Sequence, residues 1–316
     1  MTLQAVQQST ETLHGKVGRK SVIIGWLKLV RVPNLFTVPG DVIVGACLAA
    51  GEFNNFFSTT TALTIAVSLC LYISGLILND WFDIETDRVD RPFRPLVSVT
   101  VYPPIALLVG VSFIIIALCI AICIGKMTAL VAGAIAFAVV FYNWKARKIA
   151  ILGFIVMALC RGLNVLLGAT GTISALGNDV LTAIPSVVII AAGSIALYIF
   201  FVSVIAKNET RGIPNLAMRL SVPVSLAGGL FALNYTVGVS WLGIFSCVAV
   251  TFAVANAVLF IAEGKMPERI GRLISYLILV QTVALIVVGH GVSDAVIGVA
   301  ILFPLANAAG CWFYGS

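Results

Sequence analysis

Residues 77–96 read ILNDWFDIETDRVDRPFRPL and lie between two long apolar runs. The chain has 13 acidic residues, and this stretch holds Asp80, Asp83, Glu85, Asp87 and Asp90. If the preceding helix continues at about 100° per residue, the four aspartates and Asn79 share one face, whereas Glu85 falls on the other side. Like charges on one helix face repel each other, and a bound cation would offset that repulsion.

The chemistry of this acidic face favours a hard metal ion. Mg²⁺ prefers oxygen ligands, usually takes only one or two carboxylates directly, and shares its remaining shell with water and substrate phosphates. Pro92 cannot continue a helix, so the acidic face should end at the Arg-Pro-Phe-Arg-Pro corner of residues 91–95. The sequence therefore predicts a magnesium site, and a solvated acidic loop is the alternative interpretation.

The composition is that of an integral membrane protein. Hydrophobic residues make up 60% and charged residues 10% of the chain, against about 25% charged residues in soluble domains. Apolar runs predict helices near residues 22–50, 60–79, 103–124, 127–142, 150–172, 181–206, 217–238, 241–262, 271–289 and 294–314. We therefore expect an all-α bundle of nine membrane-crossing helices, with residues 294–314 as a candidate tenth.

The basic residues indicate how the bundle is oriented. With the N-terminus in the cytoplasm, all of the 19 Lys and Arg residues except Lys126 and Arg161 fall on the cytoplasmic side. The net charge of +6 thus reflects topology and does not argue for nucleic-acid binding. Residues 1–20 are predicted to be a mobile cytoplasmic tail, and residues 21–316 a single domain in a bacterial inner membrane or an organellar membrane.

The first helix should be interrupted, because Pro33 and Pro39 stand six residues apart within it. Polar groups at such a break point inward, where they line a site or satisfy freed backbone groups. Arg31 and Asn34 fit either a site role or simple anchoring of a helix end. Asp41 lies deeper, where an ionisable residue is functional by default or forms a buried ion pair.

Other polar residues could face the acidic stretch. Tyr142 and Lys145 are spaced by three at a cytoplasmic edge, where a basic group would bind phosphate or only orient the protein. In the fifth helix, Arg161 and Asn164 either line a cavity or take part in a structural pair, with Asp41 as the partner of Arg161. Glu209 follows the sixth helix and is a candidate second metal ligand.

Asn79-Asp80-x-x-Asp83-x-x-x-Asp87 resembles the NDxxDxxxD motif of the UbiA superfamily of intramembrane prenyltransferases. It follows the second helix, as it does in that family. Weaker similarities are the Arg-Val-Pro-Asn of residues 31–34, the Tyr-Asn-x-Lys-x-Arg of residues 142–147 and the loop after the sixth helix. The resemblance covers most of residues 25–290 and implies nine helices around a central cavity that opens sideways to lipid.

The resemblance also implies an activity. Members transfer a prenyl group from a polyprenyl diphosphate to a small acceptor, commonly an aromatic ring, with Mg²⁺. It implies that Asn79, Asp80, Asp83 and Asp87 hold the metal and the diphosphate, with Asp83 and Asp87 as catalytic residues. It further implies that Tyr142, Lys145 and Arg147 bind the diphosphate and that Asn34 lines the pocket. The remaining candidates for substrate binding are Arg31, Arg161, Asn164, Lys207 and Arg211.

One departure from the family concerns the second Asp-rich motif, which usually follows the sixth helix. Here only Asn208 and Glu209 stand there, between Lys207 and Arg211. Either the single glutamate suffices for a second ion, or a lysine replaces part of its charge, or catalysis is altered or lost. A transporter or lipid-binding protein with a degenerate site is the alternative function, motivated by the predicted break in the first helix and by Asp41 and Arg161.

Overall fold

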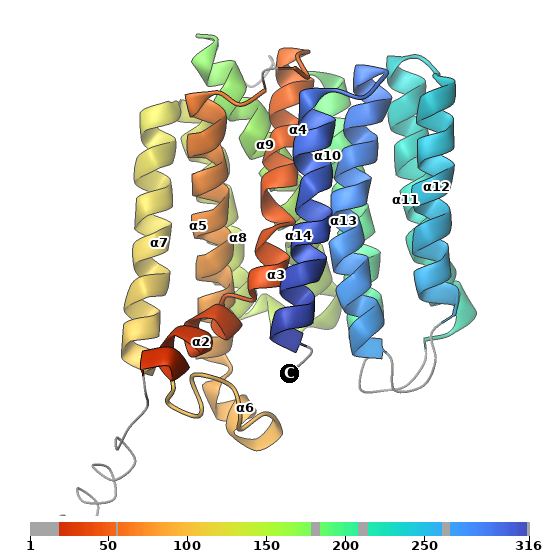
Figure 1. Ribbon diagram of the computed structural model, residues 1–316. Coiled ribbons are helices and arrows are strands. Elements are labelled where there is room, and N and C mark those ends of the chain that lie inside the picture. The colour runs from red at the N-terminus through yellow and green to blue at the C-terminus, as the bar shows by residue number, and fades with distance from the viewer. Residues whose placement is uncertain (1–18, 55, 178–183, 208–213, 261–265, 315–316) are drawn as a thin grey trace, which may run out of the picture.

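Figure 1 shows the computed structural model, whose regular elements are helices wherever the chain is described. The described residues are 19–54, 56–177, 184–207, 214–260 and 266–314. Most of the predicted tail, residues 1–18, lies outside them. Two predicted site residues, Glu209 and Arg211, also lie outside them.

Ten helices in the described ranges are long and apolar enough to cross a membrane. They run side by side, with chain neighbours in opposite directions (Figure 1). The first span consists of α3 (Val32–Leu35) and α4 (Val38–Ala50), and the others are α5 (Thr59–Phe82), α7 (Pro103–Ile124), α8 (Lys126–Trp144), α9 (Ala150–Ala175), α10 (Ser186–Ala206), α11 (Leu216–Val237), α12 (Trp241–Leu259), α13 (Met266–Gly289) and α14 (Asp294–Tyr314). The predicted all-α membrane fold is confirmed, and the candidate tenth helix is present.

The first predicted helix is broken, as its two prolines indicated. Arg31 adopts a left-handed backbone conformation with φ 48°, which separates α2 (Arg19–Leu29) from α3. A second interruption at residues 36–37 separates α3 from α4. Pro33 and Pro39 occupy the first turns of α3 and α4, where a missing N–H costs no helical hydrogen bond. The span therefore begins at Val32 and not near residue 22.

The acidic stretch forms two helices that meet at Asp83. α5 ends at Phe82, Asp83 caps it, and α6 (Ile84–Asp90) follows at the end of the bundle that also holds α2 (Figure 1). We call this the charged end. α6 stops two residues before Pro92, as expected. The predicted single helical face is thus interrupted by a turn, and the aspartates come together through the side-chain contacts described below.

Close packing of α4 against α9 fixes the broken first span. A Cβ atom on Gly45 would overlap the Val165 carbonyl oxygen, and one on Gly168 would overlap that of Val42. Small residues allow this approach of two helix backbones inside a membrane, where packing replaces the hydrophobic effect between helices. The contact holds the interruption of the first span beside the middle of α9, which carries Arg161 and Asn164.

Candidate functional site

A cavity of about 540 Å³ extends from the charged end into the bundle, between α3, α5, α8, α9, α10 and α13. Eight predicted site residues line it: Arg31, Asn34, Asn79, Tyr142, Arg147, Arg161, Asn164 and Lys207. No aspartate or glutamate is among its described lining residues. The structure therefore brings together most of the predicted substrate-binding residues, and the charged groups on the cavity wall are cations.

The cavity has a polar mouth and a largely apolar interior. Asn79 lies near the end of α5 and Ser68 lies 11 residues earlier, which places Ser68 about 16 Å deeper at 1.5 Å per residue. Between these depths the wall is made mainly of apolar side chains, among them Leu71, Val139 and Ile199. Such a shape suits a molecule with an anionic head and a hydrocarbon chain.

Three aspartates at the mouth are each paired with arginine. Arg94 Nη1 lies 3.2 Å from Asp80 Oδ1 and 2.6 Å from Asp87 Oδ2. Arg31 Nη2 lies 3.3 Å from the same Asp80 oxygen. Arg147 pairs with Asp83 and donates a hydrogen bond of 3.0 Å to the Phe82 carbonyl oxygen. We call this set the rim cluster: Asp80, Asp83, Asp87, Arg31, Arg94 and Arg147.

Burial makes the arginines of the rim cluster important for its charge state. Asp80 and Asp87 are each only 6% exposed. Burial raises the pKa of Asp87 above the ordinary aspartate value, Arg94 opposes this rise, and the negative charges of Asp83 and Asp80 add to it. Arg94 thus favours the ionised form of Asp87, which is the form that binds a cation.

The rim cluster fits a hard cation in donor chemistry. Asp80 and Asp87 both contact the same nitrogen of Arg94, so a positive group already lies between two carboxylate oxygens. Oxygen ligands of this kind suit Mg²⁺. Asp83 is directed toward Arg147 instead, and no three His, Cys, Asp or Glu side chains gather as a ready metal site within the described residues. A metal ion would therefore have to exchange with arginine.

A second polar cluster lies inside the bundle. Arg161 Nη1 is 3.0 Å from Asp41 Oδ2, and Arg161 Nη2 donates to Thr37 Oγ1 at 2.6 Å. Gln281 Nε2 donates to the Thr37 carbonyl oxygen at 2.9 Å and to Asp41 Oδ1 at 2.6 Å. We call these four residues the inner network. It satisfies a backbone carbonyl freed by the interrupted first span, as a membrane interior requires.

The two interpretations of Arg161 therefore hold together, because it pairs with Asp41 and also lines the cavity. Its neighbour Asn164 accepts a hydrogen bond of 2.9 Å from Ser68 Oγ. Both Ser68 and Asn164 line the cavity, as does Tyr72, whose ring centroid is 5.8 Å from the Arg161 guanidinium carbon. These side chains form a polar patch deep in an otherwise apolar space.

The remaining predicted residues lie in different surroundings. Lys145 caps the end of α8, is exposed, and does not line the cavity. Lys207 follows α10 at the mouth, where its Nζ lies 5.9 Å from the centre of the Phe154 ring.

Two residues that were not predicted as site residues contact the predicted aspartates. Arg94 is distinguished from the other basic residues by its position between Pro92 and Pro95, next to the acidic stretch. Gln281 is a polar residue in an apolar run, and a polar side chain within a membrane span is expected to have a hydrogen-bond partner. Both residues contact aspartates that the sequence had singled out.

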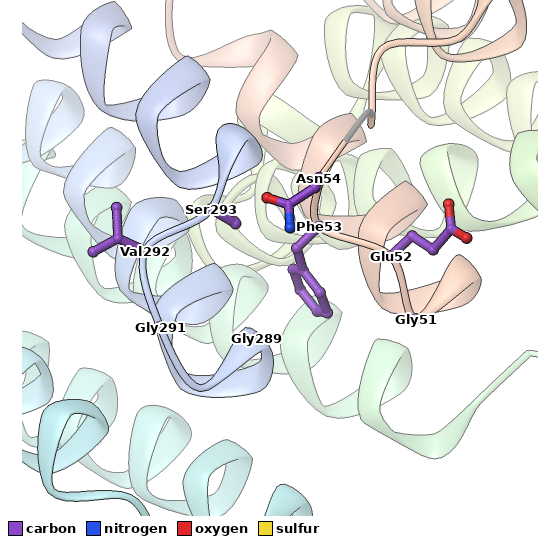
Figure 2. A pocket seen from close by; sticks show the side chains of 8 residues that line it. All are labelled: Gly51, Glu52, Phe53, Asn54, Gly289, Gly291, Val292 and Ser293. Carbon is purple, nitrogen blue, oxygen red and sulfur yellow. The ribbon is translucent and has the colours of Figure 1, made fainter.

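A second hollow of about 470 Å³ lies at the opposite end of the bundle (Figure 2). It is formed by residues 51–54 after α4 and by residues 289–293 between α13 and α14. Among its lining residues only Glu52 is charged, and Figure 2 shows that this side chain is directed away from Val292 and Ser293. The hollow has no cationic lining residue and contains none of the predicted site residues, so it does not suit a diphosphate.

Known proteins resemble this chain in sequence. Residues 41–266 match the UbiA prenyltransferase family. A digeranylgeranylglyceryl phosphate synthase of Ignicoccus hospitalis is 26% identical over 190 residues, which cover 60% of this chain and 58% of that protein. The synthase of the same name from Sulfolobus acidocaldarius is 25% identical over 198 residues, covering 62% and 69%. The chain thus spans less than two thirds of the length of the first of these relatives.

Solved structures resemble it in fold. A UbiA homologue from Aeropyrum pernix aligns with a TM-score of 0.63 at 17% identity, covering 80% of this chain and 97% of that one. A structure of digeranylgeranylglyceryl phosphate synthase aligns with a TM-score of 0.57 at 19% identity, covering 85% and 98%. The family match spans most of the chain and includes the acidic stretch, so the chain belongs to the UbiA prenyltransferase family.

Proposed function

We propose that this protein transfers a prenyl group from a polyprenyl diphosphate to a small acceptor within the membrane, with Mg²⁺. The observation that carries the proposal is the placement of the rim cluster at the mouth of an apolar cavity. A donor of this class has the same division into an anionic head and a long apolar tail.

The cationic side chains at the mouth bind the diphosphate in this proposal. Arg31, Arg147 and Lys207 line the cavity there, and guanidinium groups form strong charge-assisted hydrogen bonds with phosphate oxygens. Asn79 and Tyr142 line the same part of the cavity and offer an amide and a phenol group. The prenyl tail would extend along the apolar wall toward Ser68.

In the reaction, the allylic carbon–oxygen bond breaks and its electron pair leaves with the diphosphate. Arg31, Arg147 and Lys207 stabilise the negative charge where it develops. Mg²⁺ held by Asn79, Asp80, Asp83 and Asp87 would neutralise further charge on the leaving group. The positive allylic carbon is stabilised by aromatic faces such as Tyr72 and Phe154, and then forms a bond with the acceptor, which releases a proton.

The proposed acceptor class rests on the names of the relatives. The relatives' name describes a product with two geranylgeranyl groups on a glyceryl phosphate, so we propose an acceptor with a hydroxyl group on a glyceryl phosphate lipid. The hydroxyl group of such an acceptor would have to reach the allylic carbon beside the diphosphate, at the mouth, where Asn79 and Tyr142 offer hydrogen-bonding groups. An aromatic acceptor is the alternative, and the experiment described below includes one.

The interrupted first span fits a structural role better than a transport site. Transporters bind ions at helix breaks near the membrane midplane. Here Arg161 and Gln281 already occupy the groups around Thr37 and Asp41. The rim cluster lies at the bundle end, where a leaving diphosphate could reach water.

The test uses the purified full chain in lipid nanodiscs with Mg²⁺ and labelled geranylgeranyl diphosphate. The panel contains geranylgeranylglyceryl phosphate and hydroxylated aromatic acids. We expect a prenylated product and an equal amount of diphosphate with one acceptor, and loss of both in Asp87→Asn. Flux of a prenyl diphosphate across proteoliposomes without diphosphate release would instead support the transporter function.

A further inference from the structure

We propose that the arginines of the rim cluster exclude a divalent cation until the diphosphate arrives, so that the two ligands bind with strong positive coupling. The inference rests on the proposed function and describes how the same site is loaded. Its starting point is charge: three carboxylates face three guanidinium groups, so the rim cluster is electrically balanced.

A metal ion that arrives alone finds its ligands engaged. The Asp80 Oδ1 atom accepts from Arg94 at 3.2 Å, from Arg31 at 3.3 Å and from the Asn79 amide at 3.4 Å. The Asp87 Oδ2 atom accepts from Arg94 at 2.6 Å. Attraction of the ion to the carboxylates is offset by repulsion from neighbouring guanidinium groups at similar distances. A divalent cation alone should therefore bind weakly.

The diphosphate removes this obstacle because it offers two of the arginines another partner. Arg31 and Arg147 contact Asp80 and Asp83 and also line the cavity in which the diphosphate would lie. A guanidinium group binds phosphate with the same geometry as carboxylate. When these two side chains turn to the phosphate, they leave carboxylate oxygens for the metal. By linkage, the metal must improve diphosphate binding by the same factor.

Arg94 acts as a positioning residue with a different part in this exchange. Its side chain is 15% exposed and does not line the cavity, so it has no phosphate to turn to. Without the diphosphate it lies between Asp80 and Asp87, and a metal ion alone would have to displace it with no anion nearby to compensate the displaced guanidinium group. Beside a bound diphosphate that positive charge is compensated, so the same exchange costs less. Arg94→Gln gives the cluster a net negative charge, and should tighten binding of the metal alone and reduce the coupling. Arg94→Lys keeps the charge and should keep the coupling.

The experiment measures Mn²⁺ binding to the purified full chain in detergent, from the electron paramagnetic resonance signal of free Mn²⁺. Titrations are run with and without geranyl S-thiolodiphosphate, whose carbon–sulfur bond resists ionisation, and Mn²⁺ bound to the analogue in buffer is subtracted. We expect the analogue to tighten Mn²⁺ binding by about tenfold or more in the wild-type protein. Arg94→Gln should reduce this ratio to about threefold or less, mainly by tightening Mn²⁺ binding without the analogue.

Arg88→Gln is the matched control, because Arg88 lies in the same segment but pairs with the exposed Glu85 outside the rim cluster. It should keep the wild-type ratio, as should Arg94→Lys. A wild-type ratio near one overturns the inference, and so does weaker Mn²⁺ binding in Arg94→Gln. The wild-type ratio tests the coupling even when the Arg94→Gln variant does not fold. An analogue that binds under none of these conditions overturns the proposed function as well.

Discussion

The rim cluster and the inner network contain the same kinds of groups in different surroundings. In the inner network, Asp41 is completely buried and Arg161 is 8% exposed. The rim cluster lies at the bundle end and also contains buried carboxylates, with the side chains of Asp80 and Asp87 7% and 8% exposed, but the side chains of Arg31 and Asp83 are 34% and 26% exposed. In the inner network, loss of one member of the ion pair is costly because the other member stays largely buried without a partner. In the rim cluster, water or a ligand can take the place of a lost partner at the exposed side chains.

This difference in burial indicates that the inner network stabilises the fold and that the rim cluster can exchange its partners for a ligand. The inner network joins α4, α9 and α13 at the place where the first span lacks helical hydrogen bonds, so its pairs stabilise the fold. The rim cluster holds its pairs where a diphosphate can compete for them. Substitutions should therefore affect folding in one region and turnover in the other, and the following variants test that separation.

Asp87→Asn should have the largest effect and should act on turnover. The variant loses the charge that both Arg94 and a metal ion would bind, and we expect prenyl transfer to fall by about a thousandfold. Tm in detergent should change by only a few degrees, because the amide can still accept from Arg94. Turnover within about threefold of the wild-type rate would contradict the assigned role.

Asp41→Ala should have the next largest effect and should act on stability. It leaves the Arg161 guanidinium group buried without its carboxylate, which costs about 3–5 kcal/mol of unfolding free energy. Thermal unfolding in detergent measures the loss. Glu85→Ala is the control, since it removes an exposed acid whose partner is also exposed. Equal stability of the two variants would show that the inner network does not hold the fold.

The double variant Asp41→Leu with Arg161→Met should be more stable than Asp41→Ala. Replacing both members of a buried ion pair by apolar groups is often close to neutral, and we expect a net cost of about 1–2 kcal/mol from lost hydrogen bonds to Thr37. A double-mutant cycle with the single variants Asp41→Leu and Arg161→Met gives the coupling free energy between the two side chains. Additive losses would mean that the two side chains act independently.

Lys207→Gln should have a smaller effect, on donor binding. It removes one cation from the mouth but leaves Arg31 and Arg147 in place, so the Kd of geranyl S-thiolodiphosphate should rise by about tenfold. Isothermal titration calorimetry with Mg²⁺ present measures this. Lys126→Gln is the control, because Lys126 lies at the start of α8, at the other end of the bundle. The same Kd in both variants would remove Lys207 from the proposed site.

The membrane fold was predictable because the length of the apolar runs is a direct consequence of the thickness of the bilayer. The orientation that the basic residues indicate stays a prediction. The break in the first span was predictable from Pro33 and Pro39, since proline imposes its own local geometry. The acidic motif located the mouth of the cavity, and spacing along α9 placed Arg161 and Asn164 on its wall. These features depend on local sequence.

The partners of these residues were less predictable, because they depend on which helices pack together. Gln281 reaches Asp41 across 240 positions of sequence, and nothing near either residue indicates that contact. The turn at Asp83 directs this aspartate toward Arg147, while Asp80 and Asp87 share Arg94. A continuous helix would have kept all three carboxylates on one face, so the backbone interruption changed the chemistry of the site.

The most direct test of the central claim is a structure of the full chain with Mn²⁺ and geranyl S-thiolodiphosphate. We expect the diphosphate at the cavity mouth against Arg147 and Lys207, the ion on the carboxylates of Asp80 and Asp87, and the tail in the apolar interior. The account is contradicted if the saturating analogue binds in the hollow at the opposite end, or if the arginines still hold all three carboxylates while the cavity contains no ligand.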